Sequence, residues 1–126
     1  MWEAILILYL FNGTLLIIHE MDSAYYKEWD LFGLPGGRPW FLLLHLPLIL
    51  LILTGVLLVA ARSIWGLAIS LVMAGGGLTA FGLHTYFLRK GRPEFNNPTS
   101  KAILVGTLVL SLAQAAISLG LVIGSK

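Results

Sequence analysis

The sequence predicts an all-α integral membrane protein, a four-helix bundle that runs up and down through the bilayer as a single domain over residues 1–126. Three observations indicate this fold. Charged residues make up only 11% of the chain, against roughly a quarter in a soluble domain. Four segments approach or exceed the ~20 apolar residues that a helix needs to cross a bilayer. The connections between these segments are short, as in up-and-down bundles.

The four spans are expected at residues 2–19, 40–61, 64–88 and 102–123. No basic segment or small-residue cleavage site accompanies the first span, so we expect it to be retained rather than removed as a signal peptide. A turn-forming segment rich in proline and glycine, residues 34–39, precedes the second span. Only Arg62 and Ser63 separate the second and third spans, which should form a tight antiparallel hairpin. Thr99 or Ser100 is expected to cap the fourth span.

Small residues form stripes within two of the spans. Residues 74–77 of the third span read Ala-Gly-Gly-Gly. One face of the fourth span carries Gly106, Ala113, Ala116, Gly120 and Gly124. Small residues let membrane helices approach closely, so we expect these stripes to pack inside the bundle, with a homodimer or a larger membrane complex as the alternative. Gln114, deep in the fourth span, is expected to make an interhelical hydrogen bond.

The distribution of basic residues predicts the orientation. The end of the first span, the start of the second, the end of the third and the start of the fourth share one membrane face. That face carries Lys27, Arg38, Arg89, Lys90, Arg92 and Lys101, whereas the other carries only Arg62 and Lys126. Because positive loops stay in the cytoplasm, we expect both polar loops inside, both termini outside, and a multi-pass location in the bacterial cytoplasmic (inner) membrane.

The most polar stretch, residues 18–30, follows the first apolar run and holds four of the six acidic residues. Ionisable groups at membrane depth are unfavourable and therefore mark functional sites. The three histidines, His19, His45 and His84, each lie near a span end on the same face and at similar depth. We therefore expect them to converge on one site at the cytoplasmic surface.

Three imidazoles and a carboxylate make a four-ligand shell that suits zinc, or iron or manganese with an open position. The carboxylate can come from Glu20, Asp22 or Glu28. We favour Asp22, because its spacing of three from His19 places both side chains on one helix face. The predicted divalent-metal ligands are thus His19, Asp22, His45 and His84. Glu20 or Glu28 remains as the catalytic general base.

Two other interpretations of the same residues stay open. A hydrogen-bonded network of His, Asp and Asn side chains can join helix ends without any metal. Alternatively, His45 and His84 on facing helices can ligate haem axially, as in membrane b-type cytochromes. Haem leaves the acidic first loop without a role, and both rings lie nearer the surface than the centre of the bundle.

Composition excludes several function classes. The chain has no cysteine, which rules out disulfides, thiolate metal sites and a cysteine nucleophile. The net charge is only +2 and no basic run is interleaved with aromatic residues, so we expect the lipid bilayer as the partner and no nucleic acid. The sequence contains no phosphate loop, nucleophile elbow or dinucleotide fingerprint. No charged residue or broken helix lies at mid-membrane, which argues against a transporter.

Distinctive motifs occur near the span ends. They are His19-Glu20-x-Asp22 with Lys27-Glu28-Trp29, His45-x-Pro47, and His84 with Phe95-Asn96 and Ser100. Together they resemble a family of small uncharacterised bacterial four-helix membrane proteins, over most of the chain. The resemblance implies that these positions form one site, and it implies no reaction, because the family has none assigned.

The sequence therefore predicts a membrane protein with a metal site at the cytoplasmic face. If it is an enzyme, metal-assisted hydrolysis or lipid modification at the membrane surface is the expected reaction. The second candidate is a non-catalytic subunit or assembly factor of a larger membrane complex, docked through the small-residue face of the fourth span. The third is a haem-binding electron-transfer anchor.

Overall fold

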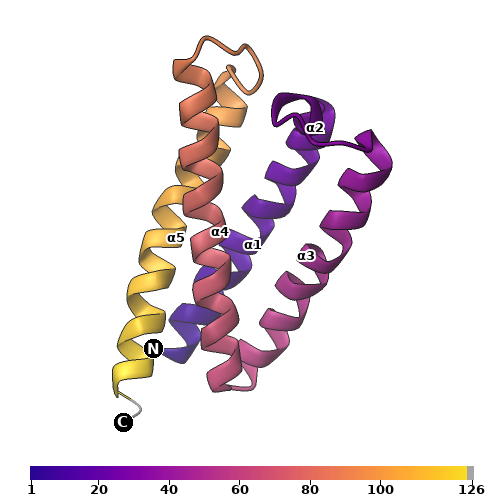
Figure 1. Cartoon of the computed structure of the whole chain (residues 1–126). Coiled ribbons are helices and arrows are strands. Elements are labelled where there is room, and N and C mark those ends of the chain that lie inside the picture. Colours follow the sequence, from indigo (N-terminus) through magenta and orange to yellow (C-terminus); the bar gives the residue numbers. More distant parts are fainter. Residues whose placement is uncertain (125–126) are drawn as a thin grey trace.

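The computed structural model describes residues 1–124 and has four long helices and one short one in that range. The long helices are α1 (Trp2–Tyr25), α3 (Gly37–Ala60), α4 (Ile64–Arg89) and α5 (Pro98–Gly124), and the short α2 (Glu28–Leu31) lies in the first loop. Each long helix is long and apolar enough to cross a membrane. This confirms the predicted all-α bundle and the multi-pass membrane class, and α1 begins at the same end of the bundle at which α5 ends (Figure 1). Lys126, assigned above to the face of the termini, lies outside the described residues.

The first loop is partly helical. α1 continues past the predicted end at His19 to Tyr25, because the polar residues that follow keep helical spacing. Lys27 then takes a left-handed backbone conformation (φ 51°) and precedes α2. Gly36 (φ 88°) precedes α3, at a position where glycine accepts a positive φ without steric cost. The loop thereby holds α2 against the end of α1.

The remaining turns use side-chain caps. Ser63 caps α4, because its hydroxyl accepts a hydrogen bond from the Trp65 N–H at 3.2 Å. The cap of α5 is Asn97 and not Thr99 or Ser100 as predicted. Asn97 Oδ1 accepts from the Ser100 N–H at 2.9 Å, and Pro98 fills the first helical position, which needs no N–H donor.

A polar seam joins α5 to α4 and α1. The buried residues of α5 are Ser100, Leu104, Thr107, Ser111, Gln114 and Ser118, spaced alternately four and three apart. Gly77 of α4 faces this seam, since a Cβ added there would collide with Ser111. The predicted stripe of small residues is a different face, because Gly120 and Gly124 are exposed. Their use as a docking surface stays a prediction.

Five buried side chains in the middle of the bundle form what we call the inner network: Asn12, Ser70, Ser111, Gln114 and Ser118. Gln114 Nε2 donates to both the carbonyl and the hydroxyl of Ser70 at 2.9 Å. Asn12 Nδ2 donates to Gln114 Oε1 at 2.9 Å and to Ser111 Oγ at 3.0 Å. Ser70 and Ser118 share a hydrogen bond of 2.9 Å. The predicted interhelical role of Gln114 is confirmed.

Helix α3 is peripheral. Within the described residues it touches α1, α2 and α4 but not α5. Only 11% of its most apolar stretch is buried, against 33% in α1 and in α4. At the α3–α4 turn the two helices are close, because Gly66 lies against the backbone of Leu58 and Val59. Toward the α2 end α3 diverges from α4 (Figure 1).

Candidate metal centre

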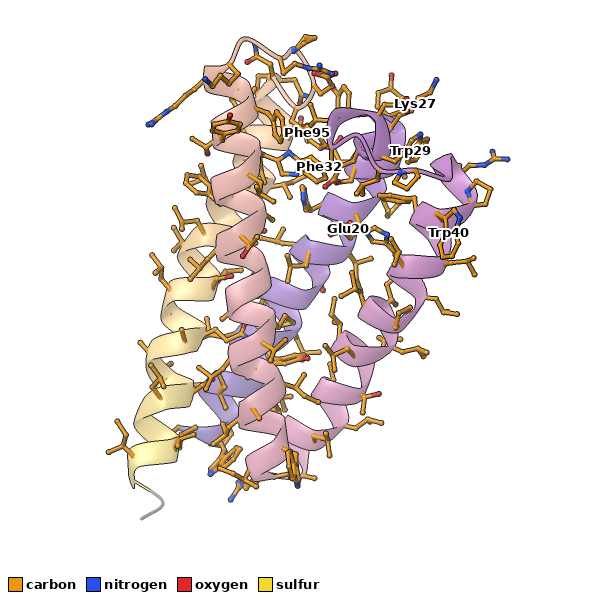
Figure 2. The ribbon with its side chains drawn as sticks, in the orientation of Figure 1. Glu20, Lys27, Trp29, Phe32, Trp40 and Phe95 are labelled. Atoms are coloured by element: carbon orange, nitrogen blue, oxygen red, sulfur yellow. The ribbon has the colours of Figure 1, made fainter. Side chains whose placement is uncertain are left out.

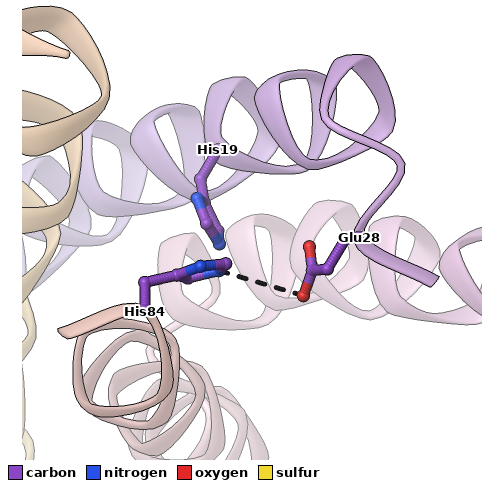
Figure 3. A group of neighbouring side chains, drawn as sticks. All are labelled: His19, Glu28 and His84. Atoms are coloured by element: carbon purple, nitrogen blue, oxygen red, sulfur yellow. Dashed lines mark ion pairs between the residues drawn. The ribbon is translucent and has the colours of Figure 1, made fainter. Parts of the chain in front are cut away.

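Three ionisable side chains converge where α1, α2 and α4 meet. His19 comes from α1, Glu28 is the first residue of α2, and His84 lies near the end of α4. One imidazole nitrogen or carboxylate oxygen of each residue lies within 4.8 Å of those of the other two. His84 Nε2 is 3.8 Å from Glu28 Oε1, and both histidine rings turn toward the glutamate (Figure 3). We call these three residues the face cluster.

The face cluster is buried but not internally hydrogen-bonded. His19 is 2% exposed and His84 is 1% exposed. A nitrogen–oxygen distance of 3.8 Å is too long for a hydrogen bond. Within the described residues, each member keeps one buried atom without a hydrogen-bond partner: His19 Nδ1, His84 Nδ1 and Glu28 Oε2. Buried polar atoms are nearly always paired, so an unpartnered atom on each of three neighbouring residues marks a candidate site for an ion or for bound water.

The donor set fits a divalent metal. Zinc–ligand bonds of about 2.0–2.1 Å in tetrahedral geometry place ligand atoms roughly 3.4 Å apart. The separations in the face cluster reach 4.8 Å, so small side-chain rotations would bring the three atoms to bonding distance. Two histidines and one glutamate with a fourth, open position is an arrangement of catalytic zinc sites.

Burial raises the pKa of the Glu28 carboxyl above its usual value, and the nearby negative charge of Glu20 raises it further. The Ser23 hydroxyl and the His45 ring act in the opposite direction and do not reverse the shift. A carboxylate in this position is unfavourable unless a cation lies against it. The burial of this carboxylate thus adds to the argument for a cation site.

A second pair, Glu20 and His45, lies beside the face cluster. His45 Nδ1 is 2.6 Å from the carbonyl oxygen of Phe41. A carbonyl only accepts, so Nδ1 carries a proton and Nε2 faces Glu20. His45 Nε2 lies 2.5 Å from Glu20 Oε2, which is within hydrogen-bonding distance. This arrangement is suited to passing a proton to or from a third group.

The structure brings only part of the predicted ligand set together. His19 and His84 meet, whereas His45 pairs with Glu20. Asp22 lies outside the cluster: its Oδ2 accepts from Ser100 Oγ at 2.5 Å and so joins α1 to the start of α5. Glu28, which the sequence offered as one of three carboxylates, occupies the acidic position instead. The sequence did not single out Glu28 as the carboxylate nearest His19, because the two residues come together only when α2 folds back over the end of α1.

Two buried or partly buried aromatic rings cover the site. The resemblance placed Phe95 among the site positions without predicting its burial, and Phe32 was not named from the sequence. Phe95, 1% exposed, places its ring 4.1 Å from the His84 ring and 5.9 Å from that of His19. Phe32 covers another side, with its ring 6.0 Å from His84 (Figure 2). Phe95 has a left-handed backbone (φ 65°), which is unfavourable for a bulky residue and is retained here by its packing. Its sequence context, a loop of polar residues and prolines, gives no sign of this burial.

The face cluster and the Glu20–His45 pair open on the same space. A cavity of about 390 Å³ between α1, α3 and α4 is lined by all five residues. Its other lining residues are mainly aliphatic and come from the three helices. One bound molecule can therefore contact both groups at the same time.

Comparisons with known proteins identify a family and assign no activity. The profile of a family described as a family of unknown function (DUF6713) matches residues 5–121. The match includes every residue of the face cluster and of the Glu20–His45 pair. No curated protein and no solved structure matches the chain. The chain thus belongs to the family of unknown function DUF6713.

Proposed function

We propose that the chain is a membrane-embedded hydrolase that uses a divalent metal held by His19, Glu28 and His84. The observation that carries the proposal is the convergence of three buried donors, each with an unpartnered atom, at one end of the bundle. The nitrogen and oxygen donors suit zinc first and iron or manganese next. Because three protein ligands leave a position open, the proposed site is a catalytic one rather than a closed structural one.

The Glu20–His45 pair supplies the acid–base chemistry. The metal would lower the pKa of a bound water. Glu20 would then accept a proton from that water, whose oxygen forms a bond to the carbonyl carbon of an ester. The ester C–O bond breaks, and the proton passes to the departing alcohol. His45 holds the Glu20 carboxylate by a hydrogen bond. In this proposal Glu20 keeps the predicted role of general base. Glu28, predicted as the alternative base, becomes a metal ligand. His45, predicted as a metal ligand, becomes the hydrogen-bonding partner of the base.

The location follows from charge and is part of the proposal. The site lies at the end of the bundle that carries the first loop and the α4–α5 loop (Figure 1). The loops and the adjoining helix ends carry Lys27, Arg38, Arg89, Lys90 and Arg92. Positive loops favour the cytoplasm, so the site would face the cytoplasmic side of a bacterial inner membrane.

The first experiment measures metal in the purified, detergent-solubilised protein by elemental analysis, with an absorbance scan for haem. The proposal predicts one equivalent of a divalent metal and no haem band. Two matched pairs of variants localise the site. Glu28→Gln and His84→Asn should weaken metal binding by more than about tenfold. The control variants Asp22→Asn and His45→Asn, which alter a carboxylate and a histidine outside the cluster, should bind the metal as the wild type does. Metal-free wild-type protein that remains folded and takes up none would overturn the proposal, and a Soret band would favour the haem interpretation.

The second experiment tests hydrolysis with a fluorogenic long-chain ester in detergent micelles. His45→Asn should retain the metal and lose kcat, because the base loses its hydrogen-bonding partner. Equal turnover by the His45→Asn variant and the wild type would remove the Glu20–His45 pair from the reaction.

A further inference from the structure

The cavity beside the face cluster extends far below it. On α4 its wall runs from His84 down to Ile69, and on α1 from Glu20 down to Tyr9. Ile69 and His84 are 15 positions apart on α4, or about 22 Å at 1.5 Å per residue. One leaflet of the hydrocarbon core is about 15 Å deep. The cavity is therefore long enough to follow a lipid chain through a whole leaflet.

The cavity opens toward the bilayer and not only toward water. Leu48 on α3 and Val72 and Leu83 on α4 line it, yet their side chains are 49%, 61% and 43% exposed. These residues mark a lateral mouth between the two helices that diverge in Figure 1. Gly76 and Ala80 line the α4 wall between Val72 and Leu83 and keep it recessed. In a membrane, the molecules next to such a mouth are lipids.

Polarity changes along the cavity in the way that an amphiphile requires. The ionisable residues of the lining, His19, Glu20, Glu28, His45 and His84, belong to the end nearest the α2 loop. Below them the lining consists largely of Leu, Ile, Val and Met side chains. A molecule with a polar head and one long alkyl chain matches both parts, with the head at the face cluster.

We propose that this cavity binds one acyl chain of a bilayer lipid, which enters between α3 and α4 and presents its ester group to His19, Glu28 and His84. The placement of the ester rests on the proposed function, because it makes the lipid the substrate of the metal site. The chain site itself rests on the cavity alone. The substrate class of the enzyme is then a membrane lipid ester rather than a water-soluble one.

Gly76 and Gly75 provide a matched pair of variants for the test. A Cβ added at either position meets nothing within 4 Å, so both side chains start from open space rather than from a helix–helix contact. Gly76 lines the cavity and Gly75 does not. Gly76→Leu therefore fills the cavity, while Gly75→Leu adds the same side chain to the lipid-facing surface one residue away.

The experiment uses the full chain in nanodiscs that contain a phosphatidylcholine with a photoreactive diazirine near the end of one acyl chain. After illumination, mass spectrometry compares labelling of the deep wall at Tyr9, Ile52 and Met73 with labelling of the outward residue Leu57. Gly76→Leu should reduce deep-wall labelling roughly tenfold relative to Leu57, because overfilling an occupied site is strongly unfavourable. Gly75→Leu should leave the ratio unchanged.

The same samples separate this proposal from the metal proposal. If deep-wall labelling is absent in the wild type or equal in all three proteins, the lipid proposal is wrong, whatever the metal content. If labelling responds to Gly76→Leu but no metal binds, the chain site stands and the proposed hydrolase is wrong. If Gly76→Leu retains metal, loses labelling and loses turnover of the long-chain ester, both proposals are supported.

Discussion

The bundle contains two clusters of buried polar side chains, the inner network and the face cluster, which differ in how far their hydrogen-bonding groups are paired. In the inner network, Gln114 uses both ends of its amide, and all three serines have partners. Within residues 1–124, its one buried side-chain atom without a partner is Asn12 Oδ1, and Thr107 Oγ1 on the same seam of α5 is also unpartnered. In the face cluster all three members keep an unpartnered atom, and no hydrogen bond joins them.

Under the proposed function, the difference separates polar side chains that hold helices together from polar side chains that bind a ligand. In lipid, helices gain little from hydrophobic association, so interhelical hydrogen bonds and close packing hold them together. The inner network supplies such bonds between α1, α4 and α5. The face cluster supplies none, and it buries a carboxylate at a position that holds no helices together. Unsatisfied groups of this kind are retained at functional sites, where a ligand completes them.

The largest effect should come from the residue that covers the face cluster. Phe95→Ala should lower the free energy of unfolding by about 3 kcal/mol, because it removes a buried ring from His84 and His19. Phe95→Gly should lose about 1 kcal/mol less, since glycine accepts a φ of 65°. The control is Phe11→Ala, which truncates a ring that is 64% exposed and should change stability by less than ~0.5 kcal/mol. Denaturant unfolding in mild detergent measures all three, and equal losses at Phe95 and Phe11 would show that Phe95 is not a packed cover.

A smaller loss is expected in the inner network. Gln114→Leu removes the hydrogen bonds to Ser70 and leaves Asn12 Nδ2 with Ser111 as its one remaining acceptor, and should cost about 2 kcal/mol. Thr14→Val is the control, because its exposed hydroxyl bonds only to Leu10 in its own helix. Metal binding should be the same in both variants. A Gln114→Leu protein as stable as the wild type would mean that the inner network does not hold the bundle together.

The smallest effect on stability is expected within the face cluster itself. In buffer with a chelator, Glu28→Gln should change the free energy of unfolding by less than ~1 kcal/mol and toward greater stability, because it removes the buried charge of a carboxylate whose pKa burial already raises. Asp22→Asn should instead destabilise, since it weakens the hydrogen bond that Ser100 donates at 2.5 Å. If Glu28→Gln destabilises the metal-free protein as much as Asp22→Asn does, Glu28 is structural.

The sequence predicted the helices well and the site only in part. Long apolar runs with short connections leave little choice of fold, and the hairpin at Arg62 and Ser63 formed as expected. Matched depth of the histidines correctly indicated that His19 and His84 converge. The partner of His45 could not be predicted, because residues 18–30 hold several carboxylates that the sequence does not distinguish. Only the packing of α3 against α1 selects Glu20 as the partner.

Two features had sequence signals of different strength. The buried residues of α5 follow one another at spacings of four and three from Ser100 to Ser118. This pattern is visible in the sequence, but the prediction used the glycine and alanine stripe instead. Serine and threonine side chains were the better guide, because their hydrogen bonds select the face that meets other helices. Phe95 had no such signal, since its burial depends on how the α4–α5 loop folds back over His84.

The most direct test of the difference between the two polar groups is the stabilisation by added Zn²⁺, measured for the wild type, Gln114→Leu and Glu28→Gln. At a free Zn²⁺ concentration of about 100 times Kd, a native-state site raises the free energy of unfolding by about 2.7 kcal/mol. We predict this increase in the wild type and in Gln114→Leu, which starts from a lower stability, and no increase in Glu28→Gln. An equal increase in Glu28→Gln, or none in the wild type, would contradict the assignment of the face cluster as a metal site.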